Sequence, residues 1–227
     1  MCGRFVQFSS LRTLETHFPI DSIAAEVVAS YNIAPTHEVL AIVHENGRRL
    51  LRLRWGLVPS WAKDLSGASR LINARAETAA QKPSFRTAFK RRRCLIVADG
   101  FYEWCGEKGS KQPYFIAPSS GSPFAFAGLW EIWKNQSAID PDEAYKSCTI
   151  LTREASASIK SIHHRMPVIL KPEAFEDWLN PEMQDTQRLQ DILHNLHIRS
   201  LQCHPVSKLV NRVQNNSAAC IAPLSDV

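Results

Sequence analysis

The chain has 227 residues, 44% of them hydrophobic, and 27 Lys plus Arg against 22 Asp plus Glu give a net charge of +5. This length and apolar content suffice for a folded core, which excludes general disorder. No apolar run approaches the roughly 18 residues of a membrane helix, and no apolar signal core follows the start Met1-Cys2-Gly3-Arg4-Phe5. We therefore expect a soluble, intracellular (cytoplasmic) protein with no membrane partner.

The predicted elements are short strands interspersed with a few helices. Leu11 opens an amphipathic helix over 11–18, with Ser9 or Ser10 available as N-cap. Apolar runs bounded by turn residues predict strands over 39–44, 50–55, 94–98, 114–117, 124–130 and 147–152. Later segments predict a strand over 168–170, helices over 171–178 and 186–196, and a strand over 200–204. Without regular strand–helix alternation, this order indicates an α+β fold of mainly antiparallel strands, a barrel-like mixed sheet with flanking helices.

The positive charge is concentrated in residues 70–112, which contain ten Lys or Arg and four acids and so carry +6. A compact basic region on an otherwise nearly neutral chain is typical of proteins that bind a polyanion, because phosphates are neutralised locally with release of counterions. A solvated charged loop around 90–93 would give the same pattern. Charge alone leaves both interpretations open.

Cysteine usage singles out one position. The six cysteines have no C-x-x-C spacing, so we expect them to be reduced, with Cys94 and Cys148 buried in apolar runs. Cys2 differs because removal of Met1 would leave a thiol and an α-amine on adjacent carbons, with pKa values of about 8.5 and about 7.7–8.0. Such an aminothiol condenses with an aldehyde to an imine and then to a thiazolidine ring. N-terminal nucleophile hydrolysis, or no special role, are the alternatives.

Three further segments combine residues suited to acid–base chemistry. In the first, Asn73, Arg75 and Glu77 alternate, so an extended backbone would place all three on one face. The second follows an apolar strand and presents Glu103 after a glycine bend, and the third contains His163. Each also has an ordinary structural interpretation: a turn at Asn73, an ion pair for Glu103 and a buried histidine.

Short blocks along the whole chain extend this pattern. They are Met1-Cys2-Gly3-Arg4-Phe5, Tyr31-Asn32-Ile33-Ala34-Pro35, Arg54-Trp55-Gly56-Leu57-Val58-Pro59, Ile72-Asn73-Ala74-Arg75-Ala76-Glu77-Thr78, Ala98-Asp99-Gly100-Phe101-Tyr102-Glu103-Trp104, Ile162-His163-His164-Arg165-Met166-Pro167 and His204-Pro205-Val206-Ser207. Taken together, these blocks resemble the SOS-response-associated peptidase family of abasic-site processing proteins, and they run in family order from residue 2 to about 216. We expect a single domain over 1–227, with residues from about 217 as a tail.

The resemblance implies a protein that forms a covalent cross-link with DNA. It implies loss of Met1 and a thiazolidine between Cys2 and the ring-opened aldehyde of an abasic site in single-stranded DNA, which protects the site during replication-associated repair. The family's active-site residues match Cys2, Asn73, Glu103 and His163. We expect His163 to open the sugar ring, Glu103 to take the proton of the amine, and Asn73 to hold the amine or a sugar hydroxyl. Abasic-site lyase activity is a related possibility of the same imine.

The blocks and the basic window also supply candidate DNA contacts. Guanidinium groups match phosphate oxygens, and aromatic rings stack on unpaired bases. The expected DNA-contact residues are Arg4, Asn32, Pro35, Trp55, Trp61, Arg75, Arg86 and Trp104. The expected partner is single-stranded DNA with abasic sites, including single-strand/double-strand junctions, bound by a monomer that is nucleoid-associated if bacterial and nuclear if eukaryotic.

Two other functions stay open at this point. One is a thiol-dependent self-processing peptidase that uses Cys2, and the other is a non-covalent single-stranded DNA-binding module. A zinc site among His194, His197, Cys203 and His204 is disfavoured, because the first two end a predicted helix, where histidines complement its dipole. We expect no metal and no cofactor.

Overall fold

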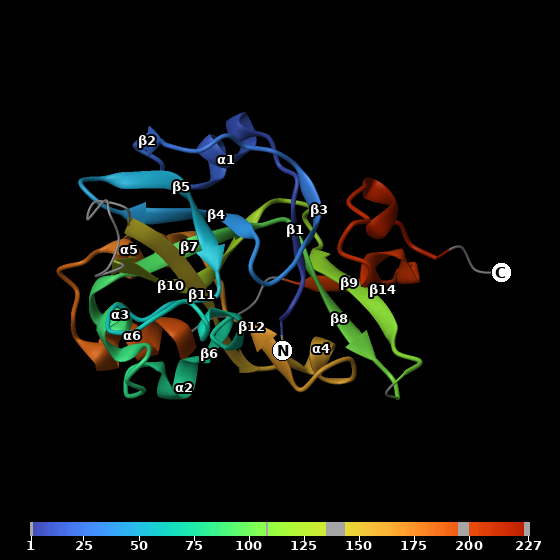
Figure 1. Ribbon diagram of the computed structural model, residues 1–227. Coiled ribbons are helices and arrows are strands. Elements are labelled where there is room, and N and C mark those ends of the chain that lie inside the picture. Colours follow the sequence, from blue (N-terminus) through green and yellow to red (C-terminus); the bar gives the residue numbers. More distant parts are fainter. Residues whose placement is uncertain (1, 108, 135–143, 195–199, 225–227) are drawn as a thin grey trace.

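The computed structural model describes residues 2–107, 109–134, 144–194 and 200–224 (Figure 1). At its centre are the five strands β4 (Glu38–His44), β5 (Arg48–Trp55), β7 (Arg93–Ala98), β10 (Phe124–Lys134) and β11 (Ala144–Glu154). Antiparallel pairs join them in the order β5-β4-β7-β10-β11, and parallel pairing of β11 with β5 closes the ring into a barrel. Closure satisfies backbone groups that an open edge would leave unpaired.

Four short strands extend the barrel at its margins. β2 (Ser22–Ile23) pairs with β5, β13 (Ile169–Leu170) pairs with β10, and both β6 (Asn73–Arg75) and β12 (Arg165–Pro167) pair with β11. Thr152 of β11 is in register with Arg75 on one side and with Pro167 on the other. The end of β11 therefore brings together two segments that are far apart in the sequence.

A second, five-stranded sheet packs beside the barrel. Its strands are β14 (Leu201–Pro205), β9 (Gln112–Pro118), β8 (Gly100–Cys105), β1 (Phe5–Gln7) and β3 (Ser30–Ile33), in that order and all antiparallel. Only Asp99 separates β7 from β8, and its carboxylate accepts hydrogen bonds from the backbone of Phe8 and Ser9. At Gly100 a Cβ atom would lie 2.3 Å from the ring of Phe115, so the two strands approach too closely there for any side chain.

Short helices cover the outside of the barrel. The helices are α1 (Leu11–His17), α2 (Ala76–Ala79), α3 (Arg86–Arg91), α4 (Ala157–Lys160), α5 (Phe175–Leu179) and α6 (Thr186–His194), with 3-10 turns at Ala68–Arg70, Pro172–Ala174, Lys208–Asn211 and Ala218–Cys220. Ser10 caps α1 by accepting a hydrogen bond from the Thr13 backbone at 3.2 Å, as the sequence predicts. No helix in the described part of the chain is long and apolar enough to cross a membrane.

The barrel strands bury apolar side chains on both faces. One face, which includes Leu95 and Val97, packs against helix residues such as Leu14, Phe89 and Trp178. The other face packs against the five-stranded sheet, where Phe5 of β1 meets Trp55 edge-on at a ring-centroid distance of 5.2 Å. Cys2 and Phe5 belong to this second core, so the core holds the N-terminal segment against the barrel.

The structure confirms the predicted α+β fold and its barrel-like mixed sheet. Every predicted strand between 39 and 152 lies within an observed one, and the late strands appear as β13 and β14. The predicted helix over 171–178 is a 3-10 turn followed by α5, and α6 is described to His194, so residues 195–196 of that prediction lie outside the described residues.

The expected C-terminal tail from about 217 is wrong for residues 217–224. Cys220 is buried, Val206 forms a bridge with Pro223, and the backbone of Leu224 donates to the carbonyl of Pro205. This part of the chain is therefore packed against the end of β14. Residues 217–224 form only one short 3-10 turn, so hydrophobic periodicity could not indicate their packing.

Candidate active site

Cys2 lies just before β1, and its side chain is 0% exposed within the core between the barrel and the second sheet. Burial raises the pKa of its thiol well above the ordinary value, and the nearby charge of Glu103 raises it further. At neutral pH the buried sulfur is therefore a thiol and not a thiolate.

Asn73 connects β6 to the N-terminal segment. Its Nδ2 atom donates a hydrogen bond to the carbonyl oxygen of Cys2 at 2.7 Å. This contact fixes the orientation of the side-chain amide and leaves Oδ1 buried, with no hydrogen-bond partner among the described residues. A buried acceptor of this kind is suited to an amine or a hydroxyl group that arrives beside Cys2.

Glu103 is supplied by β8, the strand that pairs with β1. Its side chain is 3% exposed, and β8 is held in register by Phe101 opposite Phe5. Burial raises the pKa of the Glu103 carboxyl to about 7, although the positive charge of Lys111 acts in the opposite direction. A carboxyl group with this pKa can both accept and donate a proton near neutrality.

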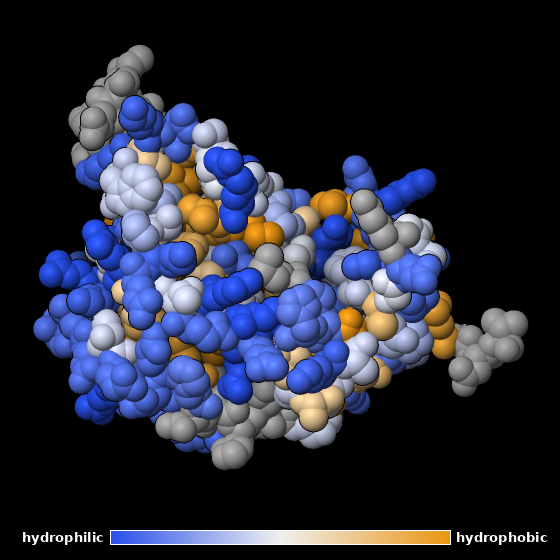
Figure 2. Space-filling model, turned by 90° about the horizontal axis from the view of Figure 1, so that it is seen from below, coloured by the Kyte–Doolittle hydropathy of each residue, from blue (hydrophilic) through white to orange (hydrophobic). Residues whose placement is uncertain are grey.

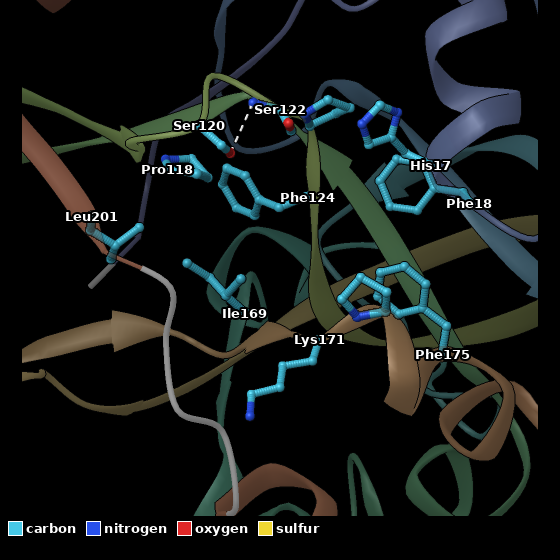
Figure 3. A pocket seen from close by; sticks show the side chains of 12 residues that line it. His17, Phe18, Pro118, Ser120, Ser122, Phe124, Ile169, Lys171, Phe175 and Leu201 are labelled. Carbon is cyan, nitrogen blue, oxygen red and sulfur yellow. Dashed lines mark hydrogen bonds between the residues drawn. The ribbon is translucent and has the colours of Figure 1, made fainter.

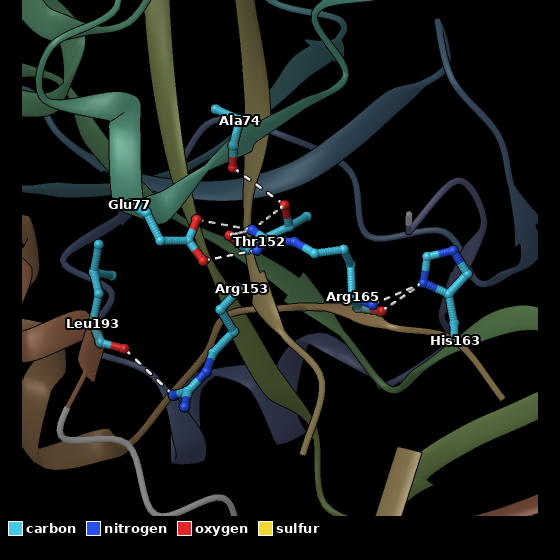
Figure 4. Close-up of polar contacts among 7 residues, drawn as sticks. All are labelled: Ala74, Glu77, Thr152, Arg153, His163, Arg165 and Leu193. Atoms are coloured by element: carbon cyan, nitrogen blue, oxygen red, sulfur yellow. Dashed lines mark hydrogen bonds and ion pairs between the residues drawn. The ribbon is translucent and has the colours of Figure 1, made fainter. Parts of the chain in front are cut away.

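His163 stands between α4 and β12. Its Nδ1 atom lies 2.9 Å from the backbone nitrogen of Arg165 and 3.0 Å from the carbonyl oxygen of the same residue (Figure 4). The ring therefore finds a backbone partner in either protonation state, and it also stacks on His164 at 4.5 Å. Burial lowers the pKa of His163, and the charges of His164 and Lys111 contribute. The neutral imidazole is favoured.

These elements meet at one end of the molecule. In Figure 1 the lower ends of β1 and β8 lie at the same end as β6, β12 and α4. Figure 2 looks at this end from below and shows that hydrophilic side chains cover most of it, with smaller apolar patches between them. Lys111 acts electrostatically on both Glu103 and His163, which places both near one cation.

The predicted common face of Asn73, Arg75 and Glu77 is wrong. β6 ends at Arg75 and α2 begins at the next residue. The alternation of side chains along the strand therefore stops before Glu77. The Glu77 carboxylate instead forms an ion pair with Arg165. Arg165 itself was not selected from the sequence, although it follows the two histidines directly.

Two of the expected DNA contacts are buried structural residues. Trp55 is 0% exposed, and its indole Nε1 donates to the carbonyl of Ile72 at 2.8 Å, so its ring cannot stack on a base. Asn32 is also buried, and its Nδ2 faces three carbonyls of the C-terminal segment, those of Val210, Arg212 and Asn215. Both expectations are therefore corrected.

Arg4 and Trp104 form hydrogen bonds with the same C-terminal segment. The guanidinium of Arg4 donates to the side chain of Asn32 at 2.6 Å and to the carbonyl of Val210 at 2.7 Å. The indole of Trp104 donates to Asn211 at 2.8 Å, and the Arg4 guanidinium lies 5.9 Å from its ring. Half-buried Pro35 and the exposed residues Trp61, Arg75 and Arg86 stay predictions as DNA contacts.

A separate apolar cavity of about 70 Å³ lies on another part of the molecule (Figure 3). Phe18, Phe124 and Phe175 form its walls, and Ile169 closes one side. None of the four candidate catalytic residues lines it. Among the described residues no group of three or more His, Cys, Asp or Glu could hold a metal ion, and His197 of the disfavoured zinc set lies outside them.

Comparison with known proteins shows which family the chain belongs to. The family model for the SOS response associated peptidase (SRAP) matches residues 1–213. The chain belongs to this family. The abasic site processing protein YoqW of Bacillus subtilis is 42% identical over 225 residues, which cover 97% of this chain and 99% of that protein. The abasic site processing protein YedK of Escherichia coli is 30% identical, with 99% and 100% covered.

A vertebrate protein and two solved structures extend the comparison. The abasic site processing protein HMCES of Gallus gallus is 34% identical over 78% of this chain and 58% of its own length. A crystal structure of a protein from Bacteroides thetaiotaomicron matches 99% of this chain and 100% of that one with a TM-score of 0.81 at 21% identity, which supports the fold alone. A phage-related protein from Bordetella bronchiseptica has a TM-score of 0.70 at 30% identity, with 91% and 95% covered.

Proposed function

We propose that this SRAP-family protein processes abasic sites in single-stranded DNA by forming a covalent thiazolidine at Cys2. The observation that carries the proposal is the hydrogen bond from Asn73 to the Cys2 carbonyl, beside a buried Glu103 whose pKa is about 7. In the chain that begins at Met1, the nitrogen of Cys2 is a peptide nitrogen and cannot form an imine. Removal of Met1 is therefore the first step.

The reaction is a condensation that releases one water molecule. The neutral α-amine of Cys2 adds to the aldehyde carbon of the ring-opened sugar, and loss of water gives an imine. The thiol sulfur then adds to the imine carbon, and its proton is transferred to the imine nitrogen, which closes the five-membered ring. No oxidant or cofactor is needed to balance these steps.

The three neighbouring residues have distinct roles in this scheme. A neutral His163 assists proton transfer when the closed sugar opens to its aldehyde. Glu103 accepts the proton that the amine must lose before it attacks. The Oδ1 atom of Asn73, which is buried and unbonded among the described residues, accepts a hydrogen bond from the amine or from a sugar hydroxyl.

The basic window supports a DNA strand as the substrate. Arg75 and Arg86 are exposed on β6 and at the start of α3, and Trp61 is 66% exposed. Arginine forks suit phosphates, and an exposed indole suits an unpaired base. Binding by a monomer, preference for single-strand/double-strand junctions and protection of the site during replication-associated repair are parts of the same proposal.

The test incubates protein lacking Met1 with a single-stranded oligonucleotide that contains one abasic site. We expect an adduct that survives denaturing electrophoresis and whose mass is that of protein plus DNA less one water, with the DNA attached to the N-terminal peptide. Cys2→Ala should abolish the adduct, whereas Cys203→Ala, at an exposed cysteine, should leave it unchanged. Cys2→Ser should form only the imine, so strand cleavage by β-elimination should replace the stable product.

The controls separate the alternatives. An oligonucleotide without an abasic site should bind without forming a covalent species. If the oligonucleotide with an abasic site also formed none, the protein would be a non-covalent DNA-binding module. Intact mass of Cys2→Ala protein made without methionine aminopeptidase tests self-processing, since a self-cleaving peptidase should retain Met1 in this variant alone. An undiminished adduct in Cys2→Ala would refute the covalent role of Cys2.

A further inference from the structure

Arg165 bridges the two segments that carry Asn73 and His163. Its guanidinium donates to both carboxylate oxygens of Glu77, at 2.7 and 2.9 Å, and to the carbonyl of Thr152 at 2.6 Å (Figure 4). The Arg165 side chain is 13% exposed and that of Glu77 is 42% exposed. A forked ion pair at a partly buried site is geometrically specific and is screened less than a pair on the open surface.

The backbone of the same arginine holds the imidazole of His163. Both backbone groups of Arg165 lie within hydrogen-bond distance of His163 Nδ1. Any rotation or shift of Arg165 on β12 therefore moves the atoms that orient the His163 ring. The carboxylate of Glu77 anchors the other end of this arginine.

Glu77 belongs to the segment that holds Cys2. It lies in the first turn of α2, which follows β6 directly, and β6 carries Asn73 and its hydrogen bond to Cys2. Thr152, between the two segments, donates weakly from Oγ1 to the carbonyl of Ala74 at 3.4 Å. A continuous series of contacts thus runs from Cys2 through β6 and Glu77 to Arg165 and His163.

We propose that Glu77 is a positioning residue for the cross-linking reaction: by holding the Arg165 guanidinium, it fixes the His163 ring relative to Cys2. This inference rests on the proposed function, because its readout is formation of the Cys2 adduct. Glu77 acts through Arg165 and does not itself contact the reacting atoms.

The charge state of Glu77 suits this role. Partial burial raises the pKa of its carboxyl group, but hydrogen bonds from Arg165 and the arginine's charge outweigh this effect, and the net shift is downward. The carboxylate is therefore ionised throughout the neutral range. Replacement by glutamine preserves size and removes both the charge and one of the two acceptors in the fork.

The experiment measures the rate of adduct formation as a function of oligonucleotide concentration, which separates the maximal rate from the half-saturating concentration. Glu77→Gln should lower the maximal rate roughly tenfold, because small misplacements of reacting groups have effects of this order or more. The half-saturating concentration should stay within about twofold, since substrate is still recognised when only orientation is lost. A general loss of folding would instead reduce the amount of active protein and the thermal midpoint.

A matched control breaks another ion pair near the same strand end. Glu154, the last residue of β11, pairs with Lys160 at 3.5 Å, and both side chains are largely exposed. Glu154→Gln should leave the maximal rate unchanged, as expected for a surface pair. Arg165→Lys keeps the charge, loses the fork and should lower the maximal rate like Glu77→Gln.

The double variant Glu77→Gln/Arg165→Lys completes the cycle. If Glu77 acts through Arg165, the double variant should be no more than about twofold slower than the slower single variant. An unchanged maximal rate in Glu77→Gln, or fully additive losses in the double variant, would overturn this inference alone. Absence of any adduct in the unsubstituted protein would overturn the proposed function, and this inference with it.

Discussion

The side-chain amide of Asn73 donates a 2.7 Å hydrogen bond to the carbonyl oxygen of Cys2, and so joins β6 to the first residues of the chain. The contact holds a segment that precedes β1 and lies outside any strand or helix. It also determines which end of the amide faces the carbonyl, and it leaves the acceptor oxygen Oδ1 buried without a hydrogen-bond partner among the described residues. The hydrogen bond from Asn73 to Cys2 thus orients both the residue that carries the proposed nucleophile and the amide beside it.

We expect Asn73→Asp to slow adduct formation more than Asn73→Ala. A carboxylate cannot donate to the Cys2 carbonyl and would place negative charge against it, whereas alanine removes the donor and the acceptor without adding a charge. The maximal rate should fall roughly tenfold for alanine and roughly a hundredfold for aspartate, measured by single-turnover gel assays at saturating DNA. Asn46→Asp, in the exposed turn between β4 and β5, is the matched control and should be neutral. Equal rates in all three variants would contradict the role of Asn73.

Glu103 predicts a pH dependence of both rate and stability. As the proton acceptor, its carboxylate form is required, so the rate should rise as pH increases through about 7, and Glu103→Gln should keep only the rise that comes from deprotonation of the α-amine, with a pKa of about 7.7–8.0. Stability should change in the opposite direction. The folded pKa of about 7 lies above the ordinary value of 4.5, so the protonated form is favoured in the folded state, and this contribution is lost as pH rises from about 4.5 to about 7.

Thermal unfolding at two pH values tests the stability half of this prediction. Glu103→Gln should raise the melting temperature relative to the unsubstituted protein at pH 8, where the buried carboxylate is charged, and change it little at pH 4, where it is neutral. Glu107→Gln, just past the end of β8 at an exposed position, should change neither value. The same melting-temperature difference at both pH values would show that Glu103 does not titrate as proposed.

The strands of the barrel could be predicted from the sequence because each contains a short, largely apolar run bounded by turn residues. β1 and β3 could not, since β1 has only three residues and exists through pairing with β3 and β8, which are distant in the sequence. Short strands of this kind are specified by partners and not by their own pattern. β6 could not be predicted for the same reason, because its partner strand β11 is distant in the sequence.

The candidate site was predictable as a set of residues and not as a geometry. Cys2, Asn73 and Glu103 were selected by chemistry and by family resemblance, and whether they catalyse a reaction stays a prediction. Glu77 was misplaced because the backbone changes from strand to helix after Arg75, which interrupts the alternation. The end of a predicted strand left Trp55 open to a core role or to base stacking, and its burial depends on contacts with Phe5 and Ile72, which its own strand does not specify.

The buried amide of Asn32 should contribute to stability and not to recognition of DNA. Its Nδ2 atom is 3.2, 3.0 and 2.7 Å from carbonyls of Val210, Arg212 and Asn215, and its Oδ1 accepts from Arg4. Asn32→Ala leaves these groups without their partner, which should cost about 2–3 kcal/mol in the free energy of unfolding.

Two measurements on Asn32→Ala separate the interpretations. Urea denaturation should show the loss, whereas Gln214→Ala, exposed in the same C-terminal segment, should change the free energy of unfolding by less than about 0.5 kcal/mol. The affinity of Asn32→Ala for an intact single-stranded oligonucleotide, measured at one fixed salt concentration, should equal that of the unsubstituted protein, because the buried amide does not reach DNA. Weaker DNA binding with unchanged stability would restore Asn32 as a DNA contact.

Arg93 shows that not every charge in the basic window faces solvent. Its guanidinium is buried and donates to the carbonyls of Phe89, Lys90 and Trp178 at 3.0, 2.6 and 2.7 Å, and to that of Asn180. Burial lowers its pKa to about 10, which still leaves the group charged at neutral pH. The arginine thus joins the ends of α3 and α5 to the barrel.

We expect Arg93→Met to destabilise the fold by roughly 3 kcal/mol, because methionine fills the space but leaves several buried carbonyls without a donor. Arg91→Met, two residues earlier and exposed at the end of α3, should cost less than about 0.5 kcal/mol. DNA binding should rank the two variants in the reverse order. If the exposed charges of α3 contact phosphates, Arg91→Met reduces the salt slope by about one and Arg93→Met leaves it unchanged at a temperature where both are folded. Equal slopes in both variants would place the DNA path away from α3, and a reduced slope for Arg93→Met alone would contradict its buried role.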